Sequence, residues 1–368
     1  MKLVYVTDSE VNPTTGGIAR ITYVMSEALR ANFGYDVYSY YGQEEFVNFI
    51  RNIGTCTIIV QSPCRFARKV FESESTLPSV KVINVFHGTP GFEIVPLKRE
   101  IIKYRFLHNI DRLWTFKQSL IQVGMSILPH KCFTQLLTKK YSLPYGKVDK
   151  MVVLSQGLID QYQSIAPGYK NHFVVIPNTL SFDNPKPHAK EKEVLVVARL
   201  DDWHKRISEI LEIWKAVQQD MRFSDWTFRI VGDGIDKQYY KDYVRQHNVR
   251  NIRFEGLQNP LPYYQKASVF LMTSACEGLP MTIMEAQQCG CVPVVYDSFA
   301  SAKDIIDSGE NGILVENRDR EAYVAALKQL MTDVTLRKKM SEACVKSSER
   351  FSVENVACQW NELIKSLW

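Results

Sequence analysis

The sequence predicts an α/β protein built from two Rossmann-like domains. The chain has 368 residues, of which 45% are hydrophobic, and this length suits two hydrophobic cores better than one. Apolar runs of strand length alternate with segments of helical periodicity, which is typical of a doubly wound parallel sheet. The alternation stops at 180–193, a charged stretch with two prolines, and then begins again.

The first half of the chain shows this alternation clearly. A strand at 2–8 precedes a helix at 17–34, which Gly34 is placed to end. Later runs are almost continuously apolar, as expected for parallel strands covered on both faces. These runs are DVYSYY, CTIIVQS, KVINVFHG, KMVVLSQ and FVVIPN.

The second half repeats the pattern, and the tail reads as helices only. Its strand-like runs are VLVVARL, WTFRIVGDG, NIRFEG, SVFLMTS, CVPVVYD and GILVE. We therefore expect an N-terminal domain at 1–182 and a C-terminal domain at 183–350. A final helix at 351–368 is long enough to pack back on the N-terminal domain.

Composition excludes several classes of protein. No stretch reaches about 18 apolar residues, so no membrane span is predicted, and the N-terminus lacks a secretory signal, which favours the cytoplasm. The eight cysteines contain no C-x-x-C pair, so we predict no zinc or other metal site. The net charge of +5 fits an anionic partner without specifying which one.

Ligands of such sheets bind at the carboxyl ends of the strands, where several candidate residues lie. Gly16 and Gly17 follow the first strand and precede a helix, so their backbone can approach an anion closely, although a plain turn explains them equally well. His87 ends the run KVINVFHG; it is either a structural histidine or a catalytic one.

The first strand of the second domain ends in a cluster of cations. Arg199, Lys205 and Arg206 lie within eight residues and could neutralise a pyrophosphate, the alternative being a solvated basic loop. The later run IVGDGID lacks the third glycine of a dinucleotide fingerprint, and a tight turn is enough to explain its two glycines.

The stretch EGLPMTIMEA, at 277–286, places two carboxylates around a strand-to-helix corner. Pro280 suits the first helical position, and Gly290 the end of the helix. Glu277 therefore lies in the loop and Glu285 beyond the first helical turn. The loop and the helix start between them can hold an anion, so a nucleotide sugar would fit. Two unrelated surface glutamates would be the simpler interpretation of this motif alone.

Taken together, these motifs resemble the retaining glycosyltransferases of GT-B fold, usually called glycosyltransferase family 4. The matching residues are Gly16-Gly17, His87, Ser155 in VVLSQ, IPN at 176–178, ARLDDWHK at 198–205, VGDG at 231–234, and the E-x7-E of EGLPMTIMEAQQCGCVPVV. Order and spacing agree over about residues 1–350, most densely in the second half. Asn178-Thr179-Leu180-Ser181 and the bulky Trp203-His204 depart from the family pattern.

The resemblance implies a GT-B architecture, in which two Rossmann-like domains face a central cleft, and a role for each matched residue. Arg199 and Lys205 would bind the donor diphosphate, Glu277 the donor sugar hydroxyls, and Glu285 the ribose. The remaining implied contacts are Gly16 and Gly17 with the diphosphate and acceptor, His87 with the sugar near the reacting carbon, and Gly278, Leu279, Pro280 and Met281 with the donor.

The chemistry expected of such a site follows from its charges. Preorganised cations and N–H dipoles stabilise a departing diphosphate in a closed cleft. The sequence has no D-x-D motif, so Arg199 and Lys205 would replace a metal ion, and no cofactor is expected. Retention would proceed by front-face attack, as the resemblance implies.

The segment 97–140 is basic and rich in apolar residues. It carries nine Lys or Arg and two acidic residues, a composition typical of segments that bind anionic membrane surfaces. The alternative is a helical insertion whose apolar face packs on the domain. The candidate membrane or acceptor surface consists of Lys98, Arg99, Lys103, Arg105, Arg112, Trp114 and Lys117. Nucleic acid is not an expected partner, because no recognised binding motif accompanies the charge.

Three functions remain open at this stage. The first is transfer of a hexose or N-acetylhexosamine, from a UDP-sugar by preference, to a glycan or polyprenyl-diphosphate-linked acceptor in surface polysaccharide synthesis such as capsule or lipopolysaccharide. The second is a nucleotide-sugar epimerase or phosphorylase on the same scaffold. The third is a protein that binds a nucleotide sugar or polysaccharide without turnover. The four charged residues Arg199, Lys205, Glu277 and Glu285 favour the first function.

Overall fold

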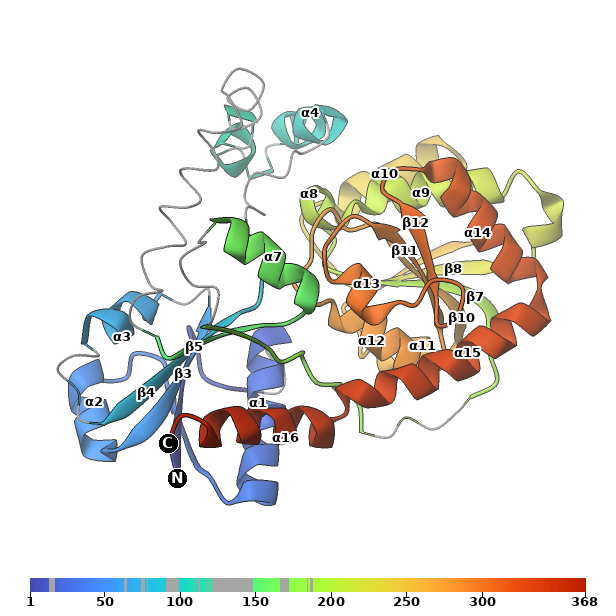
Figure 1. Ribbon diagram of the computed structural model, residues 1–368. Helices are drawn as coiled ribbons and strands as arrows, with labels where there is room; N and C mark the ends of the chain where they lie inside the picture. Colours follow the sequence, from blue (N-terminus) through green and yellow to red (C-terminus); the bar gives the residue numbers. More distant parts are fainter. Residues whose placement is uncertain are drawn as a thin grey trace. The chain divides into compact units, whose positions relative to one another are not determined.

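The computed structural model divides the chain into two compact units. Unit 1 comprises Met1–Pro90, Lys131–Ser181 and Arg350–Trp368, and unit 2 comprises Gly91–His130 and Phe182–Glu349. The structure describes residues 1–12, 17–62, 65–73, 77, 79–90, 99–108, 110–111, 113–117, 119–120, 148–165, 172–183, 185 and 188–368. Each unit contains a six-stranded sheet with parallel pairings (Figure 1). The predicted α/β class with two Rossmann-like domains is confirmed.

Unit 1 is built on a sheet with the strand order β2-β1-β3-β4-β5-β6. Its strands are β1 (Lys2–Val6), β2 (Asp36–Tyr40), β3 (Cys56–Ser62), β4 (Val80–Phe86), β5 (Lys150–Val153) and β6 (Phe173–Val175). Its helices are α1 (Gly17–Phe33), α2 (Phe46–Ile53), α3 (Ala67–Ser73), α7 (Gln156–Ile165) and α16 (Val353–Lys365). Gly34 has a φ of 68° just after α1, which is the left-handed helix end that the sequence predicts.

The C-terminal helix α16 packs in unit 1 against α1. The hydroxyl of Tyr35 donates to Oδ1 of Asn361 at 2.9 Å, and Nε1 of Trp368 donates to Oγ1 of Thr57 at 3.0 Å. Figure 1 shows α16 passing close to α1 below the sheet. The last residues of the chain therefore complete a unit whose sheet begins with its first residues.

Unit 2 is built on a sheet with the strand order β12-β11-β10-β7-β8-β9. Its strands are β7 (Glu191–Val197), β8 (Thr227–Val231), β9 (Ile252–Gly256), β10 (Ala267–Met272), β11 (Val292–Asp297) and β12 (Ile313–Glu316). Its helices are α4 (Arg99–Leu107), α8 (Asp202–Lys205), α9 (Ile207–Val217), α10 (Lys237–Gln246), α11 (Leu261–Lys266), α12 (Met281–Gln288), α13 (Ala302–Ile305), α14 (Arg320–Thr332) and α15 (Val334–Ser348). Short 3-10 turns lie at Met221–Phe223 and Glu349–Phe351.

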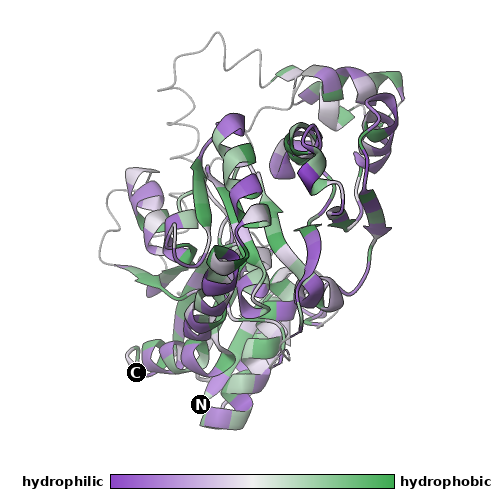
Figure 2. Ribbon diagram, turned by 90° about the vertical axis from the view of Figure 1, so that its right-hand side faces the viewer, coloured by the Kyte–Doolittle hydropathy of each residue, from purple (hydrophilic) through white to green (hydrophobic). Residues whose placement is uncertain are grey.

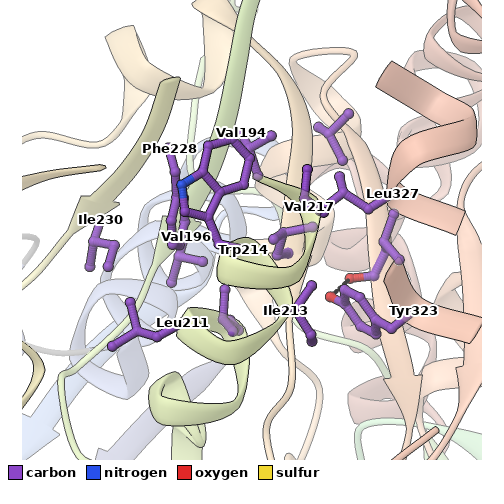
Figure 3. Packing of buried hydrophobic residues seen from close by; sticks show 14 of the residues in the cluster. Val194, Val196, Leu211, Ile213, Trp214, Val217, Phe228, Ile230, Tyr323 and Leu327 are labelled. Carbon is purple, nitrogen blue, oxygen red and sulfur yellow. Dashed lines mark hydrogen bonds between the residues drawn. The ribbon is translucent and has the colours of Figure 1, made fainter. Parts of the chain in front are cut away.

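The core of unit 2 lies between the central strands and the helices α9 and α14. Trp214 of α9 is fully buried, and its indole N–H donates to the carbonyl of Arg250 at 3.0 Å. Tyr323 of α14 is also fully buried, and its hydroxyl accepts from the backbone N–H of Met272 at 3.1 Å. Figure 3 shows these two rings among Val, Leu and Ile side chains from the sheet and both helices. This packing holds the strand ends at fixed positions.

Hydrophobic residues concentrate in the strands, whereas the helices carry hydrophilic and hydrophobic residues side by side (Figure 2). This is the distribution expected when helices cover both faces of a parallel sheet. Among the described residues, none of the helices combines the length and the apolar character that crossing a bilayer requires.

Two glycines allow the loops after β7 and β8 to touch. A Cβ on Gly232, whose φ is +137°, would lie 1.9 Å from the carbonyl oxygen of Ala198. A Cβ on Gly234 would lie 2.5 Å from the carbonyl oxygen of Leu200. The two loops are also joined by a backbone hydrogen bond from Leu200 to Asp233 of 2.9 Å. The VGDG motif thus serves close backbone packing under the loop that carries Arg199.

The described residues of 99–120 group with unit 2, which differs from the predicted N-terminal domain at 1–182. The physical reason is a buried ion pair. Arg105 of α4 donates from Nε to Oδ1 of Asp236 at 2.8 Å and from a terminal nitrogen to Oδ2 at 2.6 Å. The side chains are 1% and 0% exposed. A pattern of apolar and basic residues does not reveal a partner 131 positions away.

Candidate active site in unit 2

The candidate site begins at the carboxyl end of β7, where the chain turns into the short helix α8. Arg199 stands in this turn, and its Nε donates to a carboxylate oxygen of Asp201. The Arg199 side chain is nevertheless 64% exposed. Lys205 is the last residue of α8. Of the two cations predicted to bind a diphosphate, Arg199 therefore precedes the short helix α8 and Lys205 ends it.

Lys205 is joined to Glu277, which follows β10. The Lys205 amine donates to Oε1 of Glu277 at 2.6 Å, and the side chains are only 17% and 9% exposed. Burial alone would raise the pKa of Glu277, but the charge of Lys205 and its hydrogen bond outweigh this effect and hold that pKa below its usual value. Glu277 is therefore an ionised carboxylate at neutral pH, held in place by a cation.

The loop after β10 also binds the backbone of α8. The amide of Ala275 donates to the carbonyl of His204 at 2.7 Å, and the hydroxyl of Thr273 donates to the carbonyl of Arg206 at 3.0 Å. Nε2 of His204 lies 2.6 Å from the carbonyl oxygen of Cys276. Burial lowers the pKa of His204, so a neutral ring that donates from Nε2 fits this contact. Trp203-His204 is thus a packing element of the site.

Helix α12 starts directly after this loop. Pro280 was predicted as its first helical residue, but it is the N-cap, with an extended ψ of 109°, and Met281 begins the helix. The N-cap has non-helical torsions by definition, and Pro is compatible with it because the first N–H groups have no partner within the helix. Gly278, Leu279 and Pro280 are buried beside Glu277, while Met281 is half-buried. Gly290, with a φ of 67°, follows the end of the helix as predicted.

Glu285 lies in the second turn of α12 and is 2% exposed. Burial, followed by the charge of Glu285, raises the pKa of Tyr264 on α11. The second glutamate is therefore inside unit 2, close to a buried tyrosine, whereas Glu277 is bound to Lys205. The proposed ribose contact of Glu285 stays a prediction.

Two of the predicted site residues, His87 and Gly17, are described residues of unit 1. His87 follows β4, and its Nε2 lies 2.5 Å from the side-chain oxygen of Gln61. Burial lowers the pKa of His87 to about 4, so the ring is neutral at physiological pH. Gly17 is the first residue of α1. Gly16 lies outside the described residues.

Of the residues predicted to form a membrane surface, only some are described and exposed in the structure. Lys103 and Lys117 are exposed, and Trp114 is half-buried. Arg105 is wrong as a surface residue, because it is buried against Asp236. Lys98 and Arg112 lie outside the described residues, as does the side chain of Arg99.

Sequence reasoning missed two aspartates that hold α8 in place, Asp202 at its start and Asp236. The carboxylate of Asp202 accepts hydrogen bonds from the Ser208 amide at 2.7 Å and from its hydroxyl at 2.8 Å. The Asp202 amide in turn donates to Oδ2 of Asp236 at 2.8 Å. Both aspartates follow apolar strands, and that position was the signal that could have identified them.

A comparison with protein families agrees with this arrangement. Residues 179–346, which include Arg199, Lys205, Glu277 and Glu285, match the family model described as Glycosyl transferases group 1. This part of the chain is therefore similar to group 1 glycosyl transferases. Its range lies almost entirely within unit 2.

The chain is also similar to bacterial proteins that are named as glycosyltransferases. The chain is 28% identical over 245 residues to amylovoran biosynthesis glycosyltransferase AmsD of Erwinia amylovora, covering 63% of this chain and 66% of that protein. It is 25% identical over 237 residues to N-acetylgalactosamine-N,N'-diacetylbacillosaminyl-diphospho-undecaprenol 4-alpha-N-acetylgalactosaminyltransferase of Campylobacter jejuni, covering 61% and 62%. The matches thus span less than two thirds of the length of either relative.

Solved structures extend the likeness to both units. The lipopolysaccharide outer core galactosyltransferase WaaB aligns over 100% of both chains, with a TM-score of 0.67 and 16% sequence identity. At this identity the likeness shows the fold alone. The predicted GT-B fold class is therefore confirmed.

Proposed function

We propose that the chain is a glycosyltransferase that moves a hexose or N-acetylhexosamine from a nucleotide diphosphate sugar to a glycan or lipid-linked saccharide. The observation that carries this proposal is the Lys205–Glu277 pair, which joins the end of α8 to the loop before α12, together with the exposed Arg199 that precedes α8. A cation next to a carboxylate at a helix start can bind both ends of a sugar diphosphate.

Each residue has a distinct part in the proposed reaction. The Lys205 ammonium has three N–H donors, so it can hold Glu277 and a phosphate oxygen together. Arg199 can turn its exposed guanidinium to the second phosphate. These charges stabilise the diphosphate as the glycosyl–oxygen bond breaks, and Glu277 accepts hydrogen bonds from the sugar hydroxyls. The donor anion is thus neutralised by side chains, and we propose that the reaction requires no metal ion.

The finer assignments extend the same proposal. Glu285 would bind the ribose, His87 the donor sugar, and a uridine nucleotide is the favoured donor. Retention of configuration by front-face attack follows from the family 4 resemblance. The names of the two relatives place them in amylovoran biosynthesis and in transfer to a diphospho-undecaprenol-linked saccharide, so a surface polysaccharide is the proposed setting.

A lipid-linked acceptor would bring the protein to the inner face of the cell membrane, and the described residues of 103–120 supply a suitable surface. Leu107, Leu113 and Phe116 are 72%, 83% and 53% exposed. Lys103 and Lys117 are exposed in the same segment. Exposed apolar side chains with nearby cations favour binding to anionic lipid.

The decisive experiment supplies the protein with labelled UDP- and GDP-sugars and a bacterial membrane extract. Release of nucleoside diphosphate that depends on the extract, with label entering an extractable glycan, supports transfer. Isomerised free nucleotide sugar would indicate an epimerase instead, and binding without turnover a non-catalytic protein. Turnover in the presence of EDTA tests the metal-independent chemistry. Analysis of the anomeric configuration of the product tests retention.

A further inference from the structure

The buried pair of Arg105 and Asp236 is connected to the proposed leaving-group site through a short chain of hydrogen bonds. Asp236 binds the guanidinium of Arg105 with both carboxylate oxygens, at 2.8 and 2.6 Å. Its Oδ2 also accepts from the amide of Asp202 at 2.8 Å. Asp202 is the first residue of α8, and Lys205 is the last. One carboxylate therefore joins α4 to the helix that ends in the catalytic lysine.

Asp202 extends this connection to α9 and α10. Its carboxylate binds the amide and hydroxyl of Ser208, and it accepts from the hydroxyl of Tyr240 at 3.1 Å. Asp202 is 2% exposed and Tyr240 is fully buried. A helix of four residues has too few internal hydrogen bonds to hold its own position, so these external partners fix it.

Aromatic packing supports the same contact. The guanidinium carbon of Arg105 lies 5.0 Å from the ring centroid of Trp114. The ring of Trp114 lies 5.8 Å from that of Trp203, which is inside α8. A second contact holds α4 to α10, because the hydroxyl of Tyr104 donates to Asp242 at 2.8 Å. The segment 99–120 thus touches α8 through both a polar and an aromatic route.

We propose that Arg105 is a positioning residue, which fixes the Lys205 amine through Asp236 and Asp202 without touching the donor. This inference rests on the proposed function, because it assigns Lys205 to the leaving diphosphate. A buried ion pair contributes little net stability compared with an apolar pair of the same size, which leaves room for a positional role. The segment with the exposed apolar residues is consequently anchored beside the leaving-group site.

The test combines Arg105→Met with Lys205→Met in a double-mutant cycle. We expect Arg105→Met to lower kcat about tenfold or more with the acceptor KM unchanged. In the Lys205→Met background the same substitution should lower kcat by less than about twofold, because the amine that Arg105 positions is already absent. Equal losses in the two backgrounds would overturn the proposal. Arg105→Lys keeps the charge but loses the forked contact, so it should recover only part of the rate.

A matched control separates positioning from stability. Arg229 forms ion pairs with Glu193 at 2.5 Å and Glu255 at 2.6 Å inside unit 2. Arg229→Met should lower the Tm without lowering kcat, and an equal kcat loss in this control would contradict the inference. Arg105→Met/Asp236→Leu removes both buried charges, so it should fold while remaining slow.

A structural measurement tests the inference independently of turnover. Amide hydrogen exchange at 200–206 should accelerate in Arg105→Met and not in Arg229→Met. Only Arg105→Met removes the cation that holds Asp236, the acceptor of the Asp202 amide. Unchanged exchange in Arg105→Met would overturn the positioning role even if the wild type is an active transferase. Accelerated exchange in Arg105→Met, together with a wild type that shows no transfer, would support the positioning of α8 and contradict the proposed function.

Discussion

The Lys205 amine lies 2.6 Å from Oε1 of Glu277. The two residues belong to the segments that follow the adjacent strands β7 and β10. Neither charge could be buried alone at this depth without a large desolvation cost. Lys205 therefore holds Glu277 in its ionised form at the place where a diphosphate and a sugar would meet. The pair joins the loop after β10 to α8 and also carries the proposed chemistry.

Replacing Glu277 separates these two effects. Glu277→Ala should lower turnover by about 100-fold or more, because a contact to the sugar hydroxyls that strengthens in the transition state is lost. Glu277→Gln keeps an acceptor for Lys205 and should fold like the wild type, yet remain slow. Initial rates and circular dichroism check both variants, with Glu255→Ala as a control. A near-normal rate in Glu277→Ala would refute the assigned role.

Lys205→Met should destabilise unit 2 as well as strongly slow turnover. The substitution leaves the Glu277 carboxylate buried without its cation, at a cost of about 3 kcal/mol. Lys205→Met/Glu277→Leu removes both charges and should recover most of that loss without restoring activity. Urea unfolding of the single and double variants measures the difference. A double variant no more stable than Lys205→Met would show that the pair does not act in this way.

His87 should make the stability of unit 1 depend on pH. Burial lowers its pKa to about 4 in the folded chain, against about 6.5 when unfolded. Between these values the unfolded chain binds more protons, so the free energy of unfolding should rise as pH increases from 4 to 6.5. His87→Gln should flatten the rise. Thermal unfolding at several pH values tests it, and identical slopes in both proteins would contradict the burial effect.

Gly232→Ala should destabilise unit 2 by more than backbone strain alone. A Cβ there would lie 1.9 Å from the carbonyl oxygen of Ala198, so the loop that carries Arg199 would have to move. Gly256 also has a positive φ, +75°, but a Cβ on it would have nothing within 4 Å. Gly256→Ala should therefore lower the free energy of unfolding by about 1 kcal/mol, and Gly232→Ala should lower it by about 2 kcal/mol or more. Equal midpoints in urea unfolding would argue against the clash.

Charged substitutions should weaken binding to lipid. Leu113→Glu/Phe116→Glu removes two exposed apolar side chains and adds negative charge, so sedimentation with phosphatidylglycerol vesicles should fall severalfold. Vesicles of phosphatidylcholine alone should bind the wild type weakly. Leu257 is 82% exposed after β9, and Leu257→Glu is the matched control. An unaffected double variant would exclude this segment as the membrane surface.

The sequence by itself determined the two parallel sheets, the helix ends at Gly34 and Gly290, and the candidate residues at the ends of β7 and β10. These features are local, because apolar periodicity, glycine conformation and the position of a residue after a strand can all be read over a few neighbouring positions. The family resemblance then selected Arg199, Lys205, Glu277 and Glu285 from the residues at the strand ends.

Only the tertiary structure decided which charges meet. The sequence pointed to Lys205 and Glu277 as candidates but did not predict the salt bridge between them. The sequence pattern also predicted Arg105 to be one cation of a basic surface, whereas the structure buries Arg105 against Asp236. Such pairs join residues 72 and 131 positions apart, and their energy depends on burial and geometry that exist only after the strands and helices pack. The position of Lys205 is for that reason a property of the folded unit.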